Sequence, residues 1–400
     1  MKIKSLSSIK KLSGKRVLVR VDFNVPLKNG KIKEIYKIEK SLPTINYLLR
    51  KKAKVILVSH LGRPKGADKS LSLRPIGKKL GQLLRRNISF ISINEKFSEN
   101  SELKKLVSSI GKLAPGSVAL IENIRFIKGE DDNDKQTAKA LASLADIFVL
   151  DGFAVAHRNA ASVSGVARYL PSFAGLLMES EMQGLNRVLI KPAKPYVVIL
   201  GGAKMETKVP LIKKLLPICD YVLIGGGIVN SCLWAKDFKI GRSIVDKEFK
   251  KEALSYWNNK KIIFPIDIMV GGADGKNAKA VNLSSKFKIF DSKIGIYDIG
   301  PKSVELFKKY IVRANTIVWN GAMGMFEVKQ YRKGSYAIAR LLAKQSRGKP
   351  FCITGGGETV EIVKALKLDK KIDLVSTGGG AMLEYLSGKT LPGVRAVASK

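Results

Sequence analysis

The stretch 351-FCITGGGETV-360 carries the clearest structural signal in this chain of 400 residues. The apolar run FCIT predicts a buried strand, the three glycines predict a tight turn, and Glu358 and Thr359 stand where a helix would begin. Strand, turn and helix in this order form the repeating unit of an α/β protein. Glycine also lets a backbone approach a ligand closely, and the free N–H groups at a helix start attract phosphate.

The same pattern of an apolar strand followed by a glycine turn occurs three more times, at 197-VVILGGAK-204, 222-VLIGGGIV-229 and 375-VSTGGGA-381. A single glycine turn after a strand is a weak signal for ligand binding. Four such loops in half of the chain favour a glycine-lined phosphate site. The alternative interpretation is that they are turns that pack strands against helices.

Strand and helix patterns alternate along the whole chain, which predicts parallel α/β sheets. In the first half the expected strands are 16–22, 54–60, 88–92, 117–123 and 147–151, and the expected helices are 39–52, 73–86, 102–110 and 134–145. In the second half the expected strands are 196–200, 221–224, 262–264, 316–319, 351–354 and 373–376, and the expected helices are 210–216, 246–257, 303–313 and 334–346.

Between the two halves, 172–190 has a helical pattern without a clear strand, and Pro192 and Pro195 follow it. A single core seldom grows beyond about 250–300 residues. We therefore expect two domains, 1–172 and 191–385, joined by a connecting helix at 173–190. The final residues, 389–400, are predicted to be extended, either as a loose tail or as a strap.

Composition points to a globular protein in a reducing compartment. The hydrophobic content is 45%, and the three cysteines, Cys219, Cys232 and Cys352, show no CxxC spacing. The N-terminus lacks the apolar segment of a secretory signal, and glycines interrupt the longest uncharged run, 221–235. The prediction is a soluble, cytoplasmic protein without a membrane partner.

The charge is unusual, because 72 Lys and Arg face 33 Asp and Glu, a net charge of +39. A field of this sign concentrates anions such as phosphate esters, nucleic acid or acidic membrane. Two common nucleotide motifs are absent: a Walker A loop would need glycine at Leu383, and a GxGxxG loop would need it at Asn230. The glycine loops therefore bind phosphate in another way or not at all.

Four polar segments fall where predicted strands end: 20-RVDFNVP-26, 59-SHLGRP-64, 122-ENIRF-126 and 151-DGFAVAHR-158. Ligands of open α/β sheets bind at the carboxyl ends of strands. Arginine binds phosphate or carboxylate with two parallel hydrogen bonds. These segments predict an anion pocket, whose candidate residues are Asp22, Asn24, His60, Arg63, Arg125 and Arg158. Any one of these arginines taken alone would more often be a solvated surface charge, because the chain has 72 basic residues.

An anion pocket in one half and a glycine-lined phosphate site in the other suggest phosphoryl transfer. This chemistry depends on positioning and electrostatics more than on a covalent group. No Ser-His-Asp or Cys-His arrangement suggests a different mechanism.

In combination and in this order, RVDFNVP, SHLGRP, ENIRF, DGFAVAHR, LGGAK, IGGG, IVWNGAMGMFE, GGGET and VSTGGGA resemble the phosphoglycerate kinase family from about Lys15 to Val394. The resemblance implies a hinge-bending monomer with two Rossmann-like, three-layer α/β/α domains. It also implies that the C-terminal segment, 386–400, packs back on the first domain. The implied reaction is reversible phosphoryl transfer from 1,3-bisphosphoglycerate to MgADP, which gives 3-phosphoglycerate and MgATP in glycolysis or gluconeogenesis.

The resemblance also assigns site residues. In the first domain the residues that would hold 3-phosphoglycerate are Asp22, Phe23, Asn24, Lys37, His60, Gly62, Arg63, Arg125 and Arg158. In the second domain the nucleotide residues would be Gly202, Lys204, Lys208, Asn320, Glu327, Gly356, Gly357, Glu358 and Thr359. Lys204, Arg63 and Lys37 would be catalytic, Glu327 would bind the ribose, and Glu358 would meet Mg²⁺.

The sequence departs from the family pattern at four positions. Lys37 stands where the family has a catalytic arginine, which removes the planar fork, and Glu358 replaces the aspartate of GGGDT, although Mg²⁺ is strict about geometry. Ala322 replaces the proline of WNGP, and Ala160 replaces a common histidine.

Two other functions remain open at this point. One is a protein with the kinase fold that binds nucleotide but has lost catalysis. The other is a basic nucleic-acid-binding protein, for which the charge argues; its basic residues, however, are spread along the chain, and no RNP1, zinc-finger or KH pattern is present.

Overall fold

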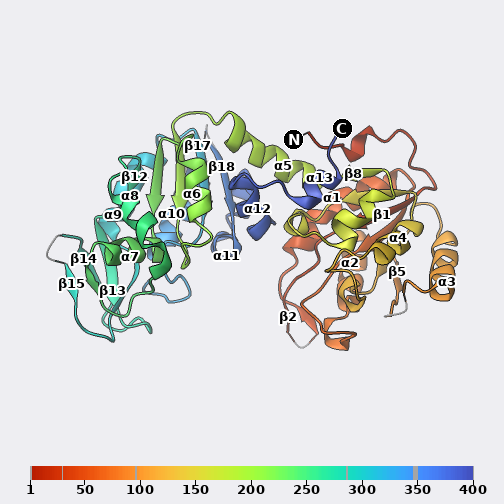
Figure 1. The fold of residues 1–400 in the computed structure, drawn as a ribbon, viewed down its shortest axis with the longest axis horizontal. Coiled ribbons are helices and arrows are strands. Elements are labelled where there is room, and N and C mark those ends of the chain that lie inside the picture. Colours follow the sequence, from red (N-terminus) through yellow and green to blue (C-terminus); the bar gives the residue numbers. More distant parts are fainter. Residues whose placement is uncertain (1, 29, 95–96, 285–286, 346–349, 400) are drawn as a thin grey trace. The chain divides into compact units, whose positions relative to one another are not determined.

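The computed structural model describes residues 2–28, 30–94, 97–284, 287–345 and 350–399, and Figure 1 shows its fold. The chain forms two compact units. The first consists of Met1–Met182 with Thr390–Lys400, and the second of Gln183–Lys389. Helix α5 (Leu176–Ile190) contributes residues to both units.

The first unit is built on a six-stranded parallel sheet with the strand order β5-β6-β4-β1-β7-β8. Its strands are β1 (Arg16–Arg20), β4 (Lys54–Val58), β5 (Ile88–Ile91), β6 (Val118–Ile121), β7 (Ile147–Leu150) and β8 (Ser172–Ala174). Its main helices are α1 (Tyr36–Arg50), α2 (Arg74–Leu84), α3 (Asn100–Gly111) and α4 (Lys135–Ser143). A small hairpin, β2 (Leu27–Lys28) with β3 (Lys31–Ile32), follows β1.

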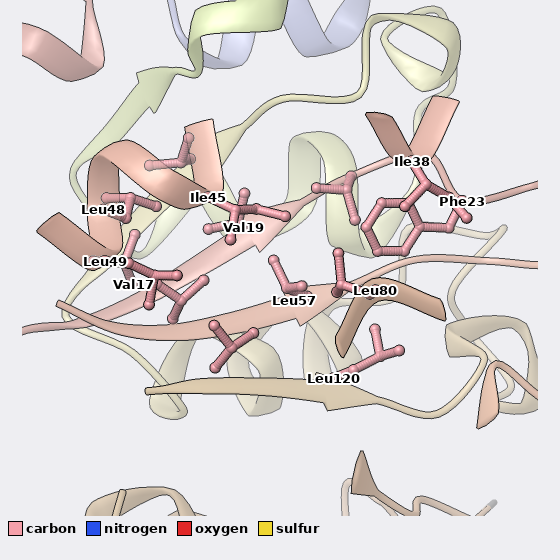
Figure 2. Close-up of a cluster of buried hydrophobic side chains, with 14 of the residues drawn as sticks. Val17, Val19, Phe23, Ile38, Ile45, Leu48, Leu49, Leu57, Leu80 and Leu120 are labelled. Carbon is pink, nitrogen blue, oxygen red and sulfur yellow. The ribbon is translucent and has the colours of Figure 1, made fainter. Parts of the chain in front are cut away.

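The core of this unit explains why these segments fold as they do. The central strands are apolar on both faces, as strands covered by helices on two sides must be. Helix α1 turns one apolar stripe toward the sheet, and Figure 2 shows this stripe packed against the valines of β1 and Leu57 of β4. The stripe consists of Ile38, Ile45, Leu48 and Leu49.

The second unit has its own six-stranded parallel sheet, with the order β12-β10-β9-β17-β18-β19. Its strands are β9 (Tyr196–Leu200), β10 (Tyr221–Ile224), β12 (Ile262–Ile263), β17 (Thr316–Asn320), β18 (Phe351–Gly355) and β19 (Leu374–Val375). Its helices are α6 (Val209–Leu215), α7 (Gly226–Ala235), α8 (Lys250–Trp257), α9 (Pro301–Ile311), α10 (Lys333–Gln345), α11 (Gly357–Ala365) and α12 (Gly379–Leu386).

The predicted fold class, α/β with two parallel sheets, is confirmed. The antiparallel sheet in the order β14-β13-β16 was missed, because its strands lie between the segments that carry a clear pattern. These strands are β13 (Asp267–Gly271), β14 (Lys279–Asn282) and β16 (Gly295–Ile299). A two-stranded ribbon of β11 (Lys239–Ile240) with β15 (Lys288–Ile289) was also missed.

Two local predictions were wrong. Residues 172–174 were expected to be helical, but they form β8, because pairing with β7 satisfies their backbone. Residues 389–400 were expected to be extended, but α13 (Pro392–Ala396) lies within them and begins with a proline, as helices tolerate at that position. The helix expected at 334–346 ends at Gln345, and residue 346, like residue 400, lies outside the described residues.

The C-terminal residues return to the first unit. Lys4 donates from its backbone to the carbonyl of Val397 at 2.8 Å, and Gly393 donates to the carbonyl of Ala156 at 2.8 Å. The predicted strap was placed at 386–400; Leu386 is the last residue of α12, and the part grouped with the first unit begins at Thr390. None of the described helices combines the length and the apolar character that a membrane span requires.

Candidate active site

The first loop of the candidate site follows β1. Asp22 is 6% exposed and Phe23 is fully buried, so the ring of Phe23 belongs to the core and its backbone N–H donates to Ser59 Oγ at 2.8 Å. The Asn24 Oδ1 atom accepts from the N–H of Gly62 at 3.0 Å. This bond ties the loop after β1 to the loop after β4, so these predicted site residues lie together.

Lys37 lies next to Asp22. From the first turn of α1, its Nζ atom donates to Asp22 Oδ2 at 2.7 Å, while the Lys37 side chain remains 27% exposed. Burial raises the pKa of Asp22, but the charge of Lys37 and its hydrogen bond outweigh burial and hold this pKa below its ordinary value. Asp22 is therefore ionised and keeps the lysine at this edge of the sheet.

The three predicted arginines gather around the same loops. Arg125 donates to the carbonyl of Gly62 at 2.7 Å and pairs with Asp131 at 2.9 Å. Arg158 is half-buried; burial, and next the charge of Arg125, lower its pKa, and Arg63 adds a smaller effect in the same direction. The buried Arg158 Nε atom has no hydrogen-bond partner among the described residues. An anion would offset the repulsion among these like charges and satisfy the unpartnered donor.

In the second unit, Lys208 and Asn320 form the buried floor of the candidate phosphate site. The Lys208 Nζ atom donates to Asn320 Oδ1, and Asn320 Nδ2 donates to the carbonyl of Gly355 at 2.7 Å. Lys208 is 7% exposed, and burial lowers its pKa to about 8, although the charge of Glu358 opposes this shift. Lys208 thus remains mainly protonated at neutral pH, in a place with little competing water.

The GGGET loop turns from β18 into α11 through Gly356, whose φ of +100° is strained for any residue with a Cβ. Thr359 is fully buried, and its hydroxyl accepts from the N–H of Gly321 at 2.9 Å and donates to the carbonyl of Gly355 at 3.0 Å. The Thr359 side chain is therefore committed to the loop itself. The exposed residue Gly357, with open space around the position of a Cβ, offers its backbone N–H group at the helix start.

Glu358 and Lys204 lie on the exposed side of these loops. Glu358 Oε2 accepts from the N–H of Ala322 at 3.0 Å. The same oxygen lies close to Gly202, because a Cβ atom at position 202 would be 3.4 Å from Oε2. Lys204 stands in the loop between β9 and α6 and makes no ion pair with a described residue. Glu358 thus lies beside the loops at Gly202 and Ala322, and the side chain of Lys204 is exposed in the loop that begins at Gly201.

A pocket of about 250 Å³ opens beside these loops. One end holds Gly202, Ala322 and Glu358, and Glu327 is an exposed residue of its rim. The remaining wall is largely apolar and comes from α7, β13, β16 and the segment 322–326. A pocket that combines a largely apolar wall with glycine loops fits a nucleotide.

A family model for phosphoglycerate kinase matches residues 6–389. The chain belongs to the phosphoglycerate kinase family. The phosphoglycerate kinase of Dictyoglomus turgidum is 44% identical over 394 residues, which cover 97% of each chain. That of Borrelia garinii is 40% identical over 401 residues, with 99% of each chain covered.

Solved structures of the family agree with this assignment. The phosphoglycerate kinase of Coxiella burnetii superposes with a TM-score of 0.85 at 36% identity and covers 99% of this chain and 100% of its own. That of Pyrococcus horikoshii superposes with a TM-score of 0.84 at 30% identity. The match covers 99% of this chain and 98% of that one. The activity of this family is phosphoryl transfer with a carboxyl group as acceptor, a step of glycolysis.

Sequence reasoning missed much of the pocket wall of this phosphoglycerate kinase family member. Asn230, Ile296 and Asp298 line it, and burial raises the pKa of Asp298 to about 8. Asp298 holds the start of α10, because it accepts from the N–H of Gly334 at 2.8 Å. The IGGG motif before α7 and the segment IVWNGAMGMFE pointed to parts of this pocket. The strand β16 had no recognisable signal.

Proposed function

We propose that the first unit binds 3-phosphoglycerate and 1,3-bisphosphoglycerate, and that the second unit binds ADP and ATP as their magnesium complexes. One observation carries the substrate assignment: the half-buried Arg158 lies beside Arg125 and Arg63 with an unpartnered Nε atom. Without an anion this arrangement is unfavourable, and a phosphate or carboxylate would satisfy it. The residues proposed to bind this substrate are Asp22, Phe23, Asn24, Lys37, His60, Gly62, Arg63, Arg125 and Arg158.

In the second unit the nucleotide would lie in the 250 Å³ pocket, with the base on the apolar wall. Glu327 would accept from the ribose hydroxyls, and Lys208 would meet the phosphates. The backbone of Gly356 and Gly357 would add N–H donors. The residues proposed to bind nucleotide are Gly202, Lys204, Lys208, Asn320, Glu327, Gly356, Gly357, Glu358 and Thr359. Thr359 would act through its backbone, because its hydroxyl is committed within the loop.

In the direction of ATP synthesis, an oxygen of the ADP β-phosphate attacks the phosphorus of the acyl phosphate. A new P–O bond forms, the bond to the acyl oxygen breaks, and the carboxylate of 3-phosphoglycerate leaves. Lys204 and Lys37 would stabilise the negative charge on the transferred group and on the leaving carboxylate. The transfer is a single displacement and needs no covalent intermediate on the protein.

The donor set fits a magnesium ion that arrives with the nucleotide. Mg²⁺ keeps several waters and is held by one or two carboxylates together with substrate phosphates. Glu358 offers such a carboxylate, exposed and next to Gly202. The described residues contain no cluster of three or more His, Cys, Asp or Glu that would hold a metal alone. When bound, Mg²⁺ would offset the charge of the nucleotide phosphates.

We further propose a cytoplasmic monomer whose partners are these small molecules rather than a membrane or a specific nucleic acid. The high positive charge would raise the local concentration of the anionic substrates.

The proposal is tested by coupling MgATP-dependent phosphorylation of 3-phosphoglycerate to an absorbance change. We expect turnover that requires 3-phosphoglycerate and that stops when EDTA removes Mg²⁺, with recovery on adding Mg²⁺ back. Nucleotide binding without turnover would instead support a kinase fold that has lost catalysis. Turnover that is unchanged in EDTA would contradict the role given to Glu358 and the metal.

Replacing Arg158 with alanine is expected to raise the KM for 3-phosphoglycerate by about 10- to 100-fold, because a charge-assisted hydrogen bond is lost. The KM for MgATP should stay the same. Arg168→Ala, which removes an exposed arginine of the same unit, is the matched control and should leave both constants unchanged. An unaltered KM for 3-phosphoglycerate in Arg158→Ala would contradict the assigned pocket.

A further inference from the structure

His60 and Arg20 form a buried contact beneath the proposed substrate site. His60 follows β4, Arg20 is the last residue of β1, and each is 2% exposed. The distance from Arg20 Nη2 to His60 Nδ1 is 3.3 Å. A guanidinium group has only donors, whereas an imidazole nitrogen can donate or accept. The hydrogen bond therefore has one possible direction, in which Arg20 donates and His60 Nδ1 accepts.

This direction fixes the state of the ring. A neutral imidazole that accepts at Nδ1 carries its hydrogen on Nε2. A protonated ring would turn an Nδ1–H toward the N–H of Arg20. Asp22 Oδ1 is 3.8 Å from Nδ1, which is too far for a hydrogen bond, and its other oxygen is held by Lys37. Only the neutral ring with Nε2–H satisfies these contacts.

Burial and the three arginines around His60 also favour the neutral ring, and only Asp22 among the named groups opposes them. Burial, and next the charge of Arg20, hold the pKa of His60 well below its ordinary value; Asp22 raises it, and Arg125 and Arg158 lower it further. The ring is thus neutral at physiological pH. Its Nε2 atom is buried and has no hydrogen-bond partner among the described residues, so one donor stays unused beside the arginines of the anion pocket.

Arg20 itself is held rigidly. Its Nε atom donates to Ser162 Oγ at 2.7 Å, and Ser162 Oγ donates to Glu130 Oε1 at 2.6 Å. The backbone N–H of Ser162 donates to the other Glu130 oxygen at 2.9 Å, and Glu130 is 2% exposed. A further donor of Arg20 reaches the carbonyl of Val21 at 2.5 Å. These contacts hold the guanidinium in one orientation, because they engage its Nε–H and one N–H of Nη1 on the sides away from His60.

We propose that Arg20 is a positioning residue that fixes His60 as the Nε2–H tautomer, so that this N–H donates to an oxygen of 3-phosphoglycerate. The inference rests on the proposed role of His60 in substrate binding. It adds that a buried arginine, without touching substrate, decides which ring nitrogen of that histidine donates and which accepts. Lysine cannot replace it, because a single ammonium lacks the fork that reaches Ser162 and His60 together.

The chain suits a direct test because it contains only two histidines, His60 and His157. We would record imidazole ¹⁵N chemical shifts of the uniformly labelled protein without substrate and assign His60 from a His157→Gln variant. The expected spectrum at pH 7 shows a protonated Nε2 and an unprotonated Nδ1 for His60. A protonated Nδ1, in either the neutral or the charged ring, would overturn the proposal.

The second measurement adds 3-phosphoglycerate to the same sample, with calorimetry to establish that it binds. The Nε2 resonance of His60 should shift on binding. If calorimetry shows binding while this resonance stays unchanged, the donor role fails although the proposed function stands. If 3-phosphoglycerate does not bind at all, the proposed function itself fails, whatever the tautomer.

The third measurement uses Arg20→Lys. The control is Arg16→Lys, because Arg16 is the first residue of the same strand β1 and pairs with Asp146 instead. In Arg20→Lys we expect a mixture of His60 tautomers. The KM for 3-phosphoglycerate should rise about tenfold, because one hydrogen bond to the substrate is lost. The KM for MgATP should stay unchanged. The control should match the wild type. A pure Nε2–H tautomer with normal KM in Arg20→Lys would overturn the role of Arg20. If that variant does not fold, the wild-type spectrum still decides the tautomer.

Discussion

Replacement of Lys204 with alanine is expected to lower kcat by about 100- to 1,000-fold, the typical loss when one preorganised group that stabilises transition-state charge is removed. Lys204 is exposed, lies two residues after Gly202 of the pocket and has no ion-pair partner among the described residues. We therefore expect its charge to be available to the transferred phosphoryl group. Because this group is bound through other contacts in the ground state, the KM for nucleotide should change little.

Steady-state kinetics with both substrates varied would measure this effect. Lys236→Ala, which removes an exposed lysine after α7, is the matched control and should retain wild-type kcat. The assignment fails if Lys204→Ala turns over at a rate close to the wild type. A loss confined to KM for nucleotide would mean that Lys204 binds ground-state phosphate rather than the migrating group.

Replacement of Lys37 with alanine should also lower kcat/KM for 3-phosphoglycerate strongly, by about 100-fold or more, because two losses combine. One is the cation itself at the edge of the substrate site. The other is the partner of Asp22, which is 6% exposed and would keep a buried charge without its 2.7 Å ion pair. Removal of one partner from such a pair is costly, so thermal unfolding should be recorded together with the kinetics.

The comparison with Lys37→Arg separates these two losses. Arginine keeps the charge beside Asp22 and restores the planar fork of the family pattern, so activity should equal or exceed that of the wild type. Lys40→Ala, one turn further along α1, where Lys40 is exposed over the ring of Tyr36, should leave kinetics unchanged. Wild-type activity in Lys37→Ala would show that this lysine is only a structural partner of Asp22.

Several motifs predicted their own local structure correctly. FCITGGGETV folds into β18, a glycine turn and α11, and the apolar runs beginning near Arg16 and Lys54 became the paired central strands β1 and β4. These segments can be recognised locally because a strand covered on both faces is mostly apolar, and a turn with positive φ favours glycine. The resemblance of ordered motifs to the phosphoglycerate kinase family was confirmed by the family match over residues 6–389.

Other parts depended on neighbours that are distant in sequence. The strand β8 exists because β7 offers it a free edge, and β16 exists because β13 pairs with it across an irregular register. Neither segment has a periodic pattern strong enough to predict a strand alone. Propensity is a weak guide where backbone pairing with another segment supplies the stabilisation.

The sequence by itself determined the parallel α/β class, the two-part organisation of the pattern and the reaction family, because these depend on local periodicity and on motifs that can be read one at a time. Only the tertiary structure decided which charges meet. The pair of Lys37 with Asp22, the cluster of Arg125 with Arg158, and the contact from Arg20 to His60 all join residues from different elements. The energy and direction of such contacts depend on distance and burial, which only packing fixes.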